Sequence, residues 1–153
     1  MTTIRRWDNG SVIHEFDGTL KQCLEDGASK GISFDHADLE NANLENLNLN
    51  NVSIKNATIT NVNLKSAILE KIDFEDTDLE NSIIDNVFFF KVNLKNASLA
   101  NSSLQFSSLF SVNFENTDTS ETDFTGTNIK LNKIKKPNFL KSKENLHKIL
   151  DQL

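Results

Sequence analysis

Apolar residues recur along most of the chain with a period of five. Among every fifth position from Phe34 to Ile129, nineteen of twenty residues are large and apolar, and Thr119 is the exception. Two positions before most of them stands a small residue (Ala, Val, Ser or Thr), whereas the other three positions are mostly polar. A helix repeats about every 3.6 residues and a strand about every 2, so either would scatter these apolar residues over all of its faces. The pattern therefore excludes a long helix or a flat sheet as the main element.

A chain that runs extended for two or three residues and then bends would turn both apolar residues of each pentapeptide toward one axis. Four such sides close a square, and stacked squares place residue i over residue i+20 at about 4.8 Å, the spacing of paired strands. Residues 32–131 then form about five coils and a rod about 24 Å long. The small residues prevent overpacking of the narrow core. Because residues 32–131 contain no proline, every backbone N–H can pair with a neighbouring coil. We therefore predict an all-β solenoid.

The repeat resembles the motif A-(D/N)-L-x-x of the pentapeptide-repeat family. Residues Ala37–Asn41 read ADLEN and residues Ala42–Asn46 read ANLEN, and the resemblance covers about two thirds of the chain. It implies the fold of that family, a right-handed quadrilateral β-helix. Because repeat scaffolds carry many different functions, the resemblance alone indicates little about function.

The segments on either side of the repeat are expected to cover its ends, since stacked strands leave unpaired edges there. We predict a β-hairpin and a capping helix in residues 1–31, the repeat in residues 32–136, and an amphipathic helix in residues 137–153. Each end of the solenoid would then carry its own cap.

Turn and cap residues define the N-terminal elements. An Asn-Gly dipeptide lies between the segments Ile4–Trp7 and Ser11–Phe16 and favours a tight hairpin turn. Thr19 and Gln22 form a capping box that begins a short helix, and Gly27 is predicted to end it.

The C-terminal segment carries apolar residues at helical spacing. This helix could fold back on the last coil, or it could pair with the same helix of a second molecule. In family members that act on DNA gyrase, a C-terminal element mediates dimerisation, so the resemblance favours a homodimer. The apolar stripe consists of Leu146, Ile149, Leu150 and Leu153.

Charge is unevenly distributed along the chain. The net charge is −6, and the seven lysines from Lys130 onward outnumber Glu144 and Asp151 by five, which leaves −11 for residues 1–129. An acidic body repels nucleic acid and attracts basic partners, including proteins that bind DNA. The alternative is that the acidity only keeps the fold soluble.

Stacking at i+20 predicts which side chains share a side of the rod. Acidic pairs recur on one side every second coil, about 10 Å apart. This side has no lysine, and its acids are Asp38, Glu40, Asp78, Glu80, Asp118 and Glu121. A neighbouring column alternates in sign, which predicts a ladder of exposed ion pairs with no binding role. Its members are Asp35, Lys55, Glu75, Lys95 and Glu115.

The opposite side breaks the rule that outward positions are polar. Contiguous exposed aromatic residues usually mark a contact surface. Three occupants remain open: a terminus of the same chain (the N-terminal hairpin or the C-terminal tail), a second copy at a dimer seam, and a partner protein. The apolar residues of this side are Ile68, Phe88, Phe90 and Phe110, and those of the adjoining side are Ile83 and Phe106.

The sequence contains no recognisable catalytic or cofactor-binding motif. Cys23 and three separated histidines form no zinc-binding pair, and the convex sides of a solenoid enclose no pocket. We therefore expect a non-enzymatic protein without metal or cofactor. No apolar run has the length of a signal peptide or reaches the ~20 residues of a membrane span, so we expect a cytoplasmic protein that does not enter a membrane.

Two functions fit these features. The first is a DNA mimic, because the acidity resembles that of family members that inhibit DNA gyrase, or protect it from quinolones, by placing an acidic rod in the enzyme's DNA groove. This chain departs from some of those members in its short rod and in its lack of inserted loops. The alternative is a scaffold that binds a protein partner through the aromatic side, with no direct contact to nucleic acid in either case.

Overall fold

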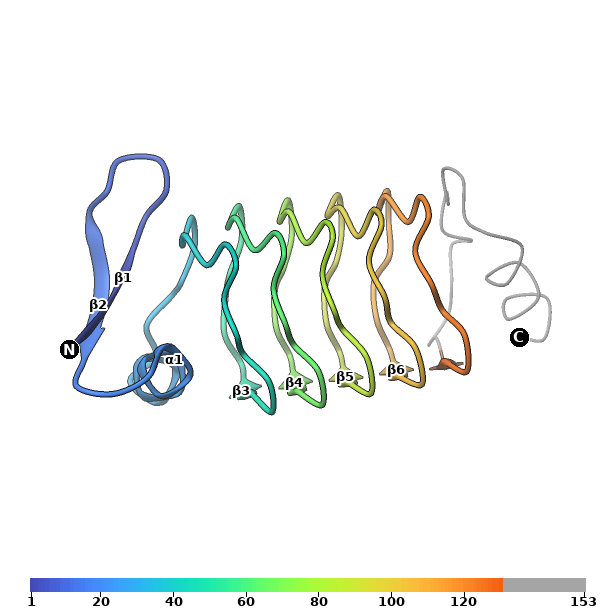
Figure 1. Cartoon of the computed structure of the whole chain (residues 1–153), viewed down its shortest axis with the longest axis horizontal. Coiled ribbons are helices and arrows are strands. Elements are labelled where there is room, and N and C mark those ends of the chain that lie inside the picture. Colours follow the sequence, from blue (N-terminus) through green and yellow to red (C-terminus); the bar gives the residue numbers. More distant parts are fainter. Residues whose placement is uncertain (131–153) are drawn as a thin grey trace.

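The computed structural model of the protein describes residues 1–130, which form a hairpin, a helix and a solenoid along one axis (Figure 1). The predicted C-terminal helix, with Leu146, Ile149, Leu150 and Leu153, lies outside these residues. The elements are β1 (Thr2–Arg5), β2 (Val12–Phe16), α1 (Leu20–Ser29), β3 (Asn48–Asn50), β4 (Ile68–Glu70), β5 (Phe88–Phe90), β6 (Ser108–Phe110) and β7 (Asn128–Lys130).

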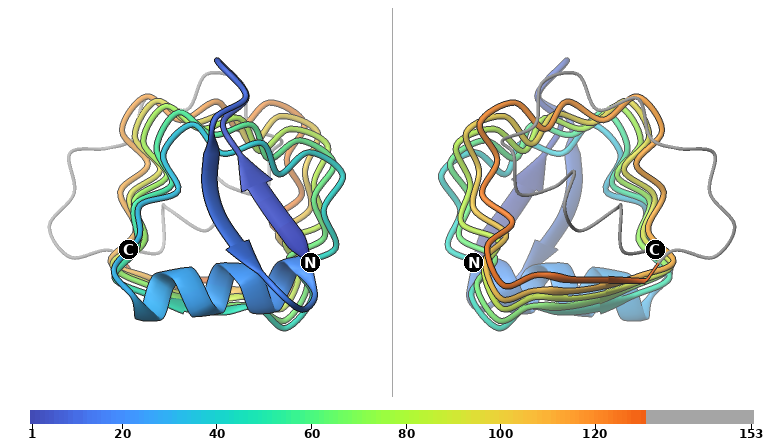
Figure 2. Two further views of the ribbon diagram at one scale, coloured as in Figure 1. Left: turned by 90° about the vertical axis from the view of Figure 1, so that its left-hand side faces the viewer. Right: turned by 90° about the vertical axis from the view of Figure 1, so that its right-hand side faces the viewer.

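Strands β3 to β7 stack in parallel along one side of the solenoid, in the order of the sequence. Each residue lies beside the residue twenty positions further on, so that Leu69 is flanked by Leu49 and Phe89. Isolated bridges with the same spacing, such as that between Asp38 and Thr58, hold the other sides. From β3 to β7 the chain makes four complete turns of twenty residues, and the coils nearly superimpose when viewed along the axis (Figure 2). The predicted quadrilateral β-solenoid is confirmed.

The core contains both inward residues of almost every pentapeptide. All twenty central residues from Phe34 to Ile129 are buried, including Thr119. Buried Ser and Thr at the small positions donate to carbonyls of the preceding coil, as Thr77 Oγ1 does to the O of Ile54 at 2.9 Å. These hydroxyls therefore fill the narrow core without being left unsatisfied. The Thr119 hydroxyl differs, because it has no hydrogen-bond partner among residues 1–130.

Each bend of the solenoid uses a left-handed residue two positions after the central one. Eighteen non-glycine residues have φ between 53° and 64°, and ten of them are Asn. Asn tolerates this conformation because its short side chain can hydrogen-bond locally. This requirement explains the many Asn residues, which the periodicity identified only as polar.

The N-terminal hairpin pairs β1 with β2 and continues onto the first coil. The turn contains the predicted Asn-Gly pair, and β1 ends at Arg5, before Trp7. Trp7 instead contacts the solenoid: its backbone N donates to the O of His36 at 2.9 Å, and its Nε1 donates to the O of Asn56 at 2.6 Å. These bonds cover part of the unpaired edge of the first coil.

Helix α1 lies at the N-terminal end of the solenoid and contacts β3 (Figures 1 and 2). It begins at the predicted capping box, in which the N of Gln22 donates to the Thr19 hydroxyl at 3.2 Å and the N of Thr19 donates to Gln22 Oε1 at 2.9 Å. The helix does not end at Gly27, as predicted, but continues to Ser29. Gly27 is buried, and a Cβ there would lie 2.6 Å from the ring of Phe34. The glycine is therefore needed for close packing of the helix on the first coil.

Candidate functional site

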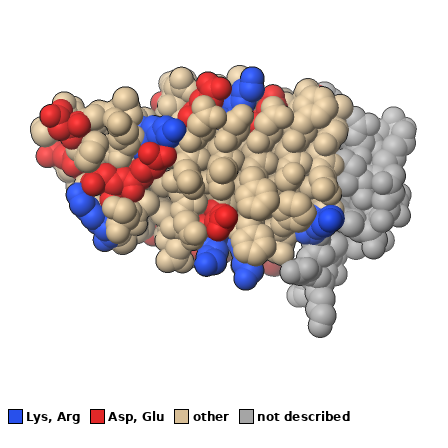
Figure 3. All heavy atoms as spheres, turned by 90° about the horizontal axis from the view of Figure 1, so that it is seen from below, with Lys and Arg blue, Asp and Glu red and all other residues tan. Residues whose placement is uncertain are grey.

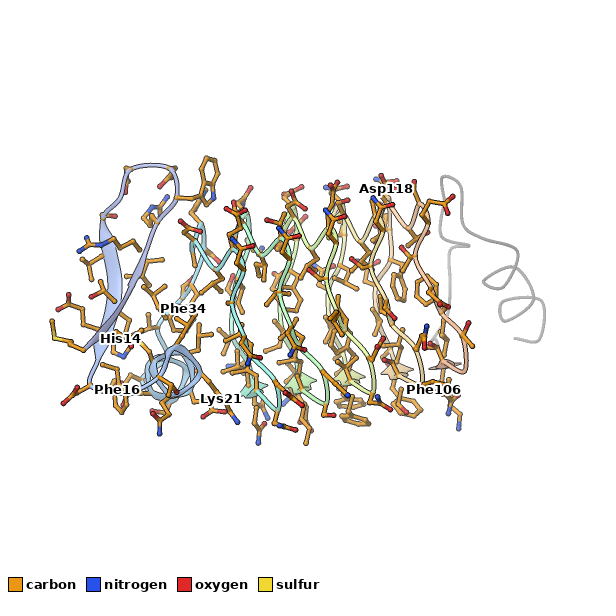
Figure 4. The ribbon with its side chains drawn as sticks, viewed as in Figure 1. His14, Phe16, Lys21, Phe34, Phe106 and Asp118 are labelled. Carbon is orange, nitrogen blue, oxygen red and sulfur yellow. The ribbon has the colours of Figure 1, made fainter. Side chains whose placement is uncertain are left out.

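Two opposite sides of the solenoid carry the residues that the sequence singled out. We name the side formed by β3–β7 the strand face. Figure 4 shows Phe106 beside this face and Asp118 on the other side of the rod. We name that second side the acidic face, after Asp38, Glu40, Asp78, Glu80, Asp118 and Glu121.

The aspartates of the acidic face form one column. Each accepts the backbone N–H two residues further on, and the distance from Asp78 Oδ1 to the N of Glu80 is 3.0 Å. Equivalent bonds form at the first and last aspartate of the column. The aspartates therefore stabilise the bend as well as supplying charge. Parallel bridges join the column, one coil after the next, in the order Asp38, Thr58, Asp78, Ser98 and Asp118.

The acidic face is less exposed than its composition implies. Glu80 Oε1 accepts a hydrogen bond from Ser98 Oγ at 2.8 Å, which holds this carboxylate close to the surface of the rod. Half of the acids on this face therefore project only partly into solvent. The exposed ones are Asp38, Glu40 and Glu121, and the half-buried ones are Asp78, Glu80 and Asp118.

Negative charge is concentrated in parts of the solenoid. Residues 32–129 contain fifteen acids and five lysines, a net charge of −10. Seven of the acids lie from Glu70 to Asp85, and none lies from Asn86 to Phe114. A DNA duplex of the same ~24 Å length carries about 14 phosphate charges. The solenoid thus approaches the charge of a duplex, but its distribution is interrupted.

The column of alternating charge forms ion pairs in its central part. Lys55 Nζ lies 3.3 Å from Glu75 Oε2, and Lys95 Nζ lies 3.6 Å from Glu75 Oε1. Lys55 Nζ also lies 3.0 Å from Asp73 Oδ2, and hydrogen bonding to Asp73 and Glu75 raises the pKa of Lys55. Asp35 differs from the prediction, because its carboxylate accepts the backbone N–H of Lys55 at 2.9 Å. The column stabilises the stacking of the coils.

The strand face carries an apolar patch, which we define as Ile68, Phe88, Phe90, Phe106 and Phe110, and the rest of residues 1–130 leaves it exposed. Ile68 and Phe106 are 45% and 61% exposed, and the other three are half-buried. The ring centroids of Phe88 and Phe110 are 5.6 Å apart, so the patch is continuous across β5 and β6. The hairpin and α1 lie at the N-terminal end of the rod and leave it open (Figure 1). The N-terminal hairpin is therefore excluded as the occupant of this patch.

Lysines border the apolar patch. Figure 3 shows this side as a largely uncharged surface with charged groups at its margins. Lys91 Nζ lies 5.2 Å from the centre of the Phe90 ring, and Lys130 Nζ lies 5.7 Å from that of Phe110. Such cation–π contacts hold the ammonium groups beside the rings. Lys71 precedes Lys91 by twenty residues, so the two occupy equivalent bends of successive coils.

The other titratable residues that the sequence singled out stabilise the N-terminal cap. His14 Nε2 lies 2.7 Å from Asp26 Oδ2, and the histidine side chain is only 10% exposed. Cys23 is buried in the core, and burial raises the pKa of its thiol. Within residues 1–130, no group of three or more His, Cys, Asp or Glu side chains could hold a metal ion. In the same part of the chain, no helix has the length and apolarity that a membrane crossing requires.

Parallel coils of pentapeptides with a left-handed residue at each bend define a pentapeptide-repeat β-helix. Residues 32–70 and 59–96 match the family described as pentapeptide repeats (8 copies). Residues 32–96 are therefore pentapeptide repeats of this family. No curated protein matches it.

Several solved structures of pentapeptide repeat proteins are similar to this chain. Rfr23 from the cyanobacterium Cyanothece 51142 is 27% identical, with a TM-score of 0.41, over 55% of this chain and 60% of that chain. A protein from the Arabidopsis thaliana thylakoid lumen is 19% identical, with a TM-score of 0.48, over 75% and 74%. Full-length QnrB1, a plasmid-mediated fluoroquinolone resistance protein, is 10% identical, with a TM-score of 0.37, over 80% and 78%. The chain thus spans less than two thirds of the length of Rfr23.

Proposed function

We propose that this chain is a non-enzymatic binding protein that mimics DNA, and that its acidic rod occupies the DNA-binding surface of a basic protein such as DNA gyrase. The observation that supports the proposal is the acidic face, a whole side of the solenoid without a lysine. A surface that binds DNA carries positive charge and attracts such a rod. The rod itself repels nucleic acid, so the partner is a protein.

The magnitude of the charge supports mimicry by the rod as a whole. Its net charge of −10 compares with about 14 for a duplex of equal length. At physiological salt the Debye length is about 8 Å, close to the ~10 Å between acidic pairs on the face. A partner approaching from solvent therefore senses these pairs as a nearly continuous negative column.

The rigidity of the acidic face favours the same function. Hydrogen bonds from the backbone hold Asp38, Asp78 and Asp118 in fixed positions just before the bends. A basic partner would therefore lose little entropy in ordering these carboxylates when it binds. The strongest contact is expected near Glu70–Asp85, where the acids are densest.

A supercoiling assay with purified gyrase tests this function directly. The natural chain is expected to inhibit supercoiling, or to protect the enzyme from a quinolone, at micromolar concentration. The variant Asp38→Asn, Glu40→Gln, Asp78→Asn, Glu80→Gln should lose the effect. Asn keeps the side-chain oxygen that accepts the turn hydrogen bond, so this variant removes charge while keeping the fold.

A matched variant removes the same charge elsewhere. Glu15→Gln, Asp17→Asn, Glu45→Gln, Glu115→Gln also neutralises four acids but leaves the acidic face and the stretch Glu70–Asp85 intact, and it should retain the effect. Equal loss in both variants would indicate nonspecific electrostatics. The absence of any effect of the natural chain on gyrase would reject gyrase as the partner.

The homodimer and the cytoplasmic location stay predictions. Pairing of two chains end to end would double the length of the acidic rod and improve the match to a duplex. Sedimentation equilibrium of the full chain tests the pairing, and fractionation of the host cell tests the location.

A further inference from the structure

We propose that the strand face is a second binding site, which takes an acidic amphipathic helix of a partner protein. This site is independent of the acidic face, since the two lie on opposite sides of the solenoid (Figure 4). Its apolar centre is the patch defined above, and its positive border is formed by Lys71, Lys91 and Lys130.

The apolar residues are confined to the middle of the strand face. The outward positions of the first strand, β3, are both Asn, and those of the last strand, β7, are Asn and Lys. Only β4, β5 and β6 place Ile or Phe there. Since the same repeat tolerates polar residues at either end of the face, folding does not require the central ones to be apolar.

Charge around the patch is complementary to an acidic partner. The stretch from Asn86 to Phe114 contains Lys91 and Lys95 but no acid, although residues 32–129 as a whole carry −10. Among residues 1–130, Lys71 and Lys91 form no salt bridge, so both ammonium groups are available. The one carboxylate within β3–β7 is Glu70, which accepts a hydrogen bond from Asn50 Nδ2 at 3.3 Å.

Phe106 provides separate support for a binding role. It stands in a bend with φ of 56°, a conformation that is unfavourable for a bulky residue. Its ring lies over the next coil, where a Cβ on Gly126 would be 2.5 Å from Phe106 Cδ1. An aromatic residue that is strained, 61% exposed and accommodated by a glycine is typical of a functional position.

The size of the patch favours a helix over a second copy of the chain. Five side chains, three of them half-buried, offer apolar area on the order of a few hundred Å², whereas a stable protein interface buries about 800 Å² on each partner. A helix presents side chains about 5–6 Å apart at i and i+4, which matches the ~4.8 Å between coils. A helix about 10 Å wide lying along the rod could therefore contact Ile68, Phe88 and Phe110 with its apolar face and the lysines with its acidic edge.

An anionic membrane is a less suitable occupant. It would also offer apolar and negative groups, but a flat bilayer would face the whole rod, whose net charge of −10 opposes contact. A narrow helix contacts only the middle of the strand face, where Glu70 is the one carboxylate within β3–β7, and so avoids most of this repulsion.

The test uses a labelled synthetic helix of roughly 15 residues, with Leu along one face and Glu along its border, and measures binding to the full chain by fluorescence anisotropy. A second peptide has every Glu replaced by Lys. The acidic peptide is expected to bind at least about tenfold more tightly than the basic one. Phe88→Ser with Phe110→Ser should weaken binding at least about tenfold. Lys71→Glu with Lys91→Glu, which leaves the apolar residues in place, should reverse the preference between the peptides.

Controls distinguish this site from the acidic face and from other occupants. The variant with Asp38, Glu40, Asp78 and Glu80 neutralised should bind the acidic peptide at least as well as the natural chain. Equal binding of both peptides, or unchanged binding by the charge-reversed variant, would overturn the proposal. Binding to phosphatidylserine vesicles that Phe88→Ser with Phe110→Ser abolishes, without peptide binding, would assign the face to a membrane. A dimer that the same two substitutions dissociate would assign it to a second copy.

Discussion

The acidic face and the strand face are built from the same pentapeptide, yet their outward residues have different physical origins. On both sides the central residue is buried and the bend is left-handed. On the acidic face, Asp78 accepts a backbone N–H in the bend, so part of its role is structural. Phe88 and Phe110 have no polar atom with which to serve the bend, and they remain accessible to solvent. The fold therefore partly explains the acids but does not explain the aromatic residues.

This difference identifies which observations carry functional information. A residue that stabilises the bend would be favoured in any pentapeptide repeat, whether or not it binds a partner. An outward aromatic residue exposes apolar surface to water, so a contact is needed to account for it. The experiments below vary core, bend and surface in turn, and they are ordered from the largest expected effect to the smallest.

Substitutions of two adjacent residues of β5 should differ most in their effect on the free energy of unfolding. Phe89→Ala removes a fully buried ring and should lower the free energy of unfolding by about 3–5 kcal/mol, because the narrow core cannot close around the space. Phe88→Ala, on the outward side of the same strand, should cost less than about 1.5 kcal/mol. Urea unfolding followed by circular dichroism measures both. Similar losses in the two variants would show that the strand face is part of the stabilising core.

Gly126 should be the most sensitive bend residue. Gly126→Ala introduces a Cβ at φ of 71° and 2.5 Å from the ring of Phe106. The backbone conformation alone should cost about 1–2 kcal/mol, and displacement of the ring adds to it. In a chain that also carries Phe106→Asn, the cost of displacing the ring should disappear and only the backbone cost should remain. A double-mutant cycle measured by thermal unfolding isolates this coupling, and additive effects would contradict the contact.

Substitutions of Phe106 and Asp78 should change the stability of the fold in opposite directions. Phe106→Asn places the residue type preferred in the bends at a left-handed position and should stabilise the chain by about 1 kcal/mol, while weakening binding of the acidic peptide. Asp78→Ala removes a turn acceptor and should destabilise by about 1 kcal/mol, and Asp78→Asn should be nearly neutral. Melting temperatures of the three variants check this. Destabilisation by Phe106→Asn would mean that the ring contributes to the fold.

Acid sensitivity should arise outside both faces and should be the smallest effect. Burial acts to raise the pKa of Asp35, but hydrogen bonds from Ser53 Oγ and from the backbone N of Lys55 outweigh it and leave the pKa below its ordinary value. Because the folded pKa is the lower one, Asp35 stabilises the fold above its unfolded value of about 3.9, and this stabilisation is lost as the pH falls through the folded pKa. Asp35→Asn should make the pH dependence of stability shallower below about pH 4. Unfolding curves at several acidic pH values measure this dependence. If the hydrogen bonds of Asp35 contribute nothing, the stability of Asp35→Asn and that of the natural chain will change equally with pH.

Much of the solenoid could be predicted because its contacts repeat in one dimension. Each coil contacts only its neighbours, so a period of five and a square cross-section determine which residues stack. The spacing alone placed Ile68 beside Phe88 and Phe90 beside Phe110, as the strand register shows. The exposure of these residues could not be predicted in the same way, because it depends on where the termini lie.

The sequence by itself determined the period, the buried positions and the grouping of side chains on each side of the rod, since all three follow from one backbone geometry repeated every five residues. Only the tertiary structure decided that Gly27 belongs inside a helix packed on Phe34, that Trp7 reaches across to Asn56, and that the hairpin leaves the aromatic patch open. Those features arise from contacts between residues distant in the chain and outside the repeat, where no periodicity indicates the partner.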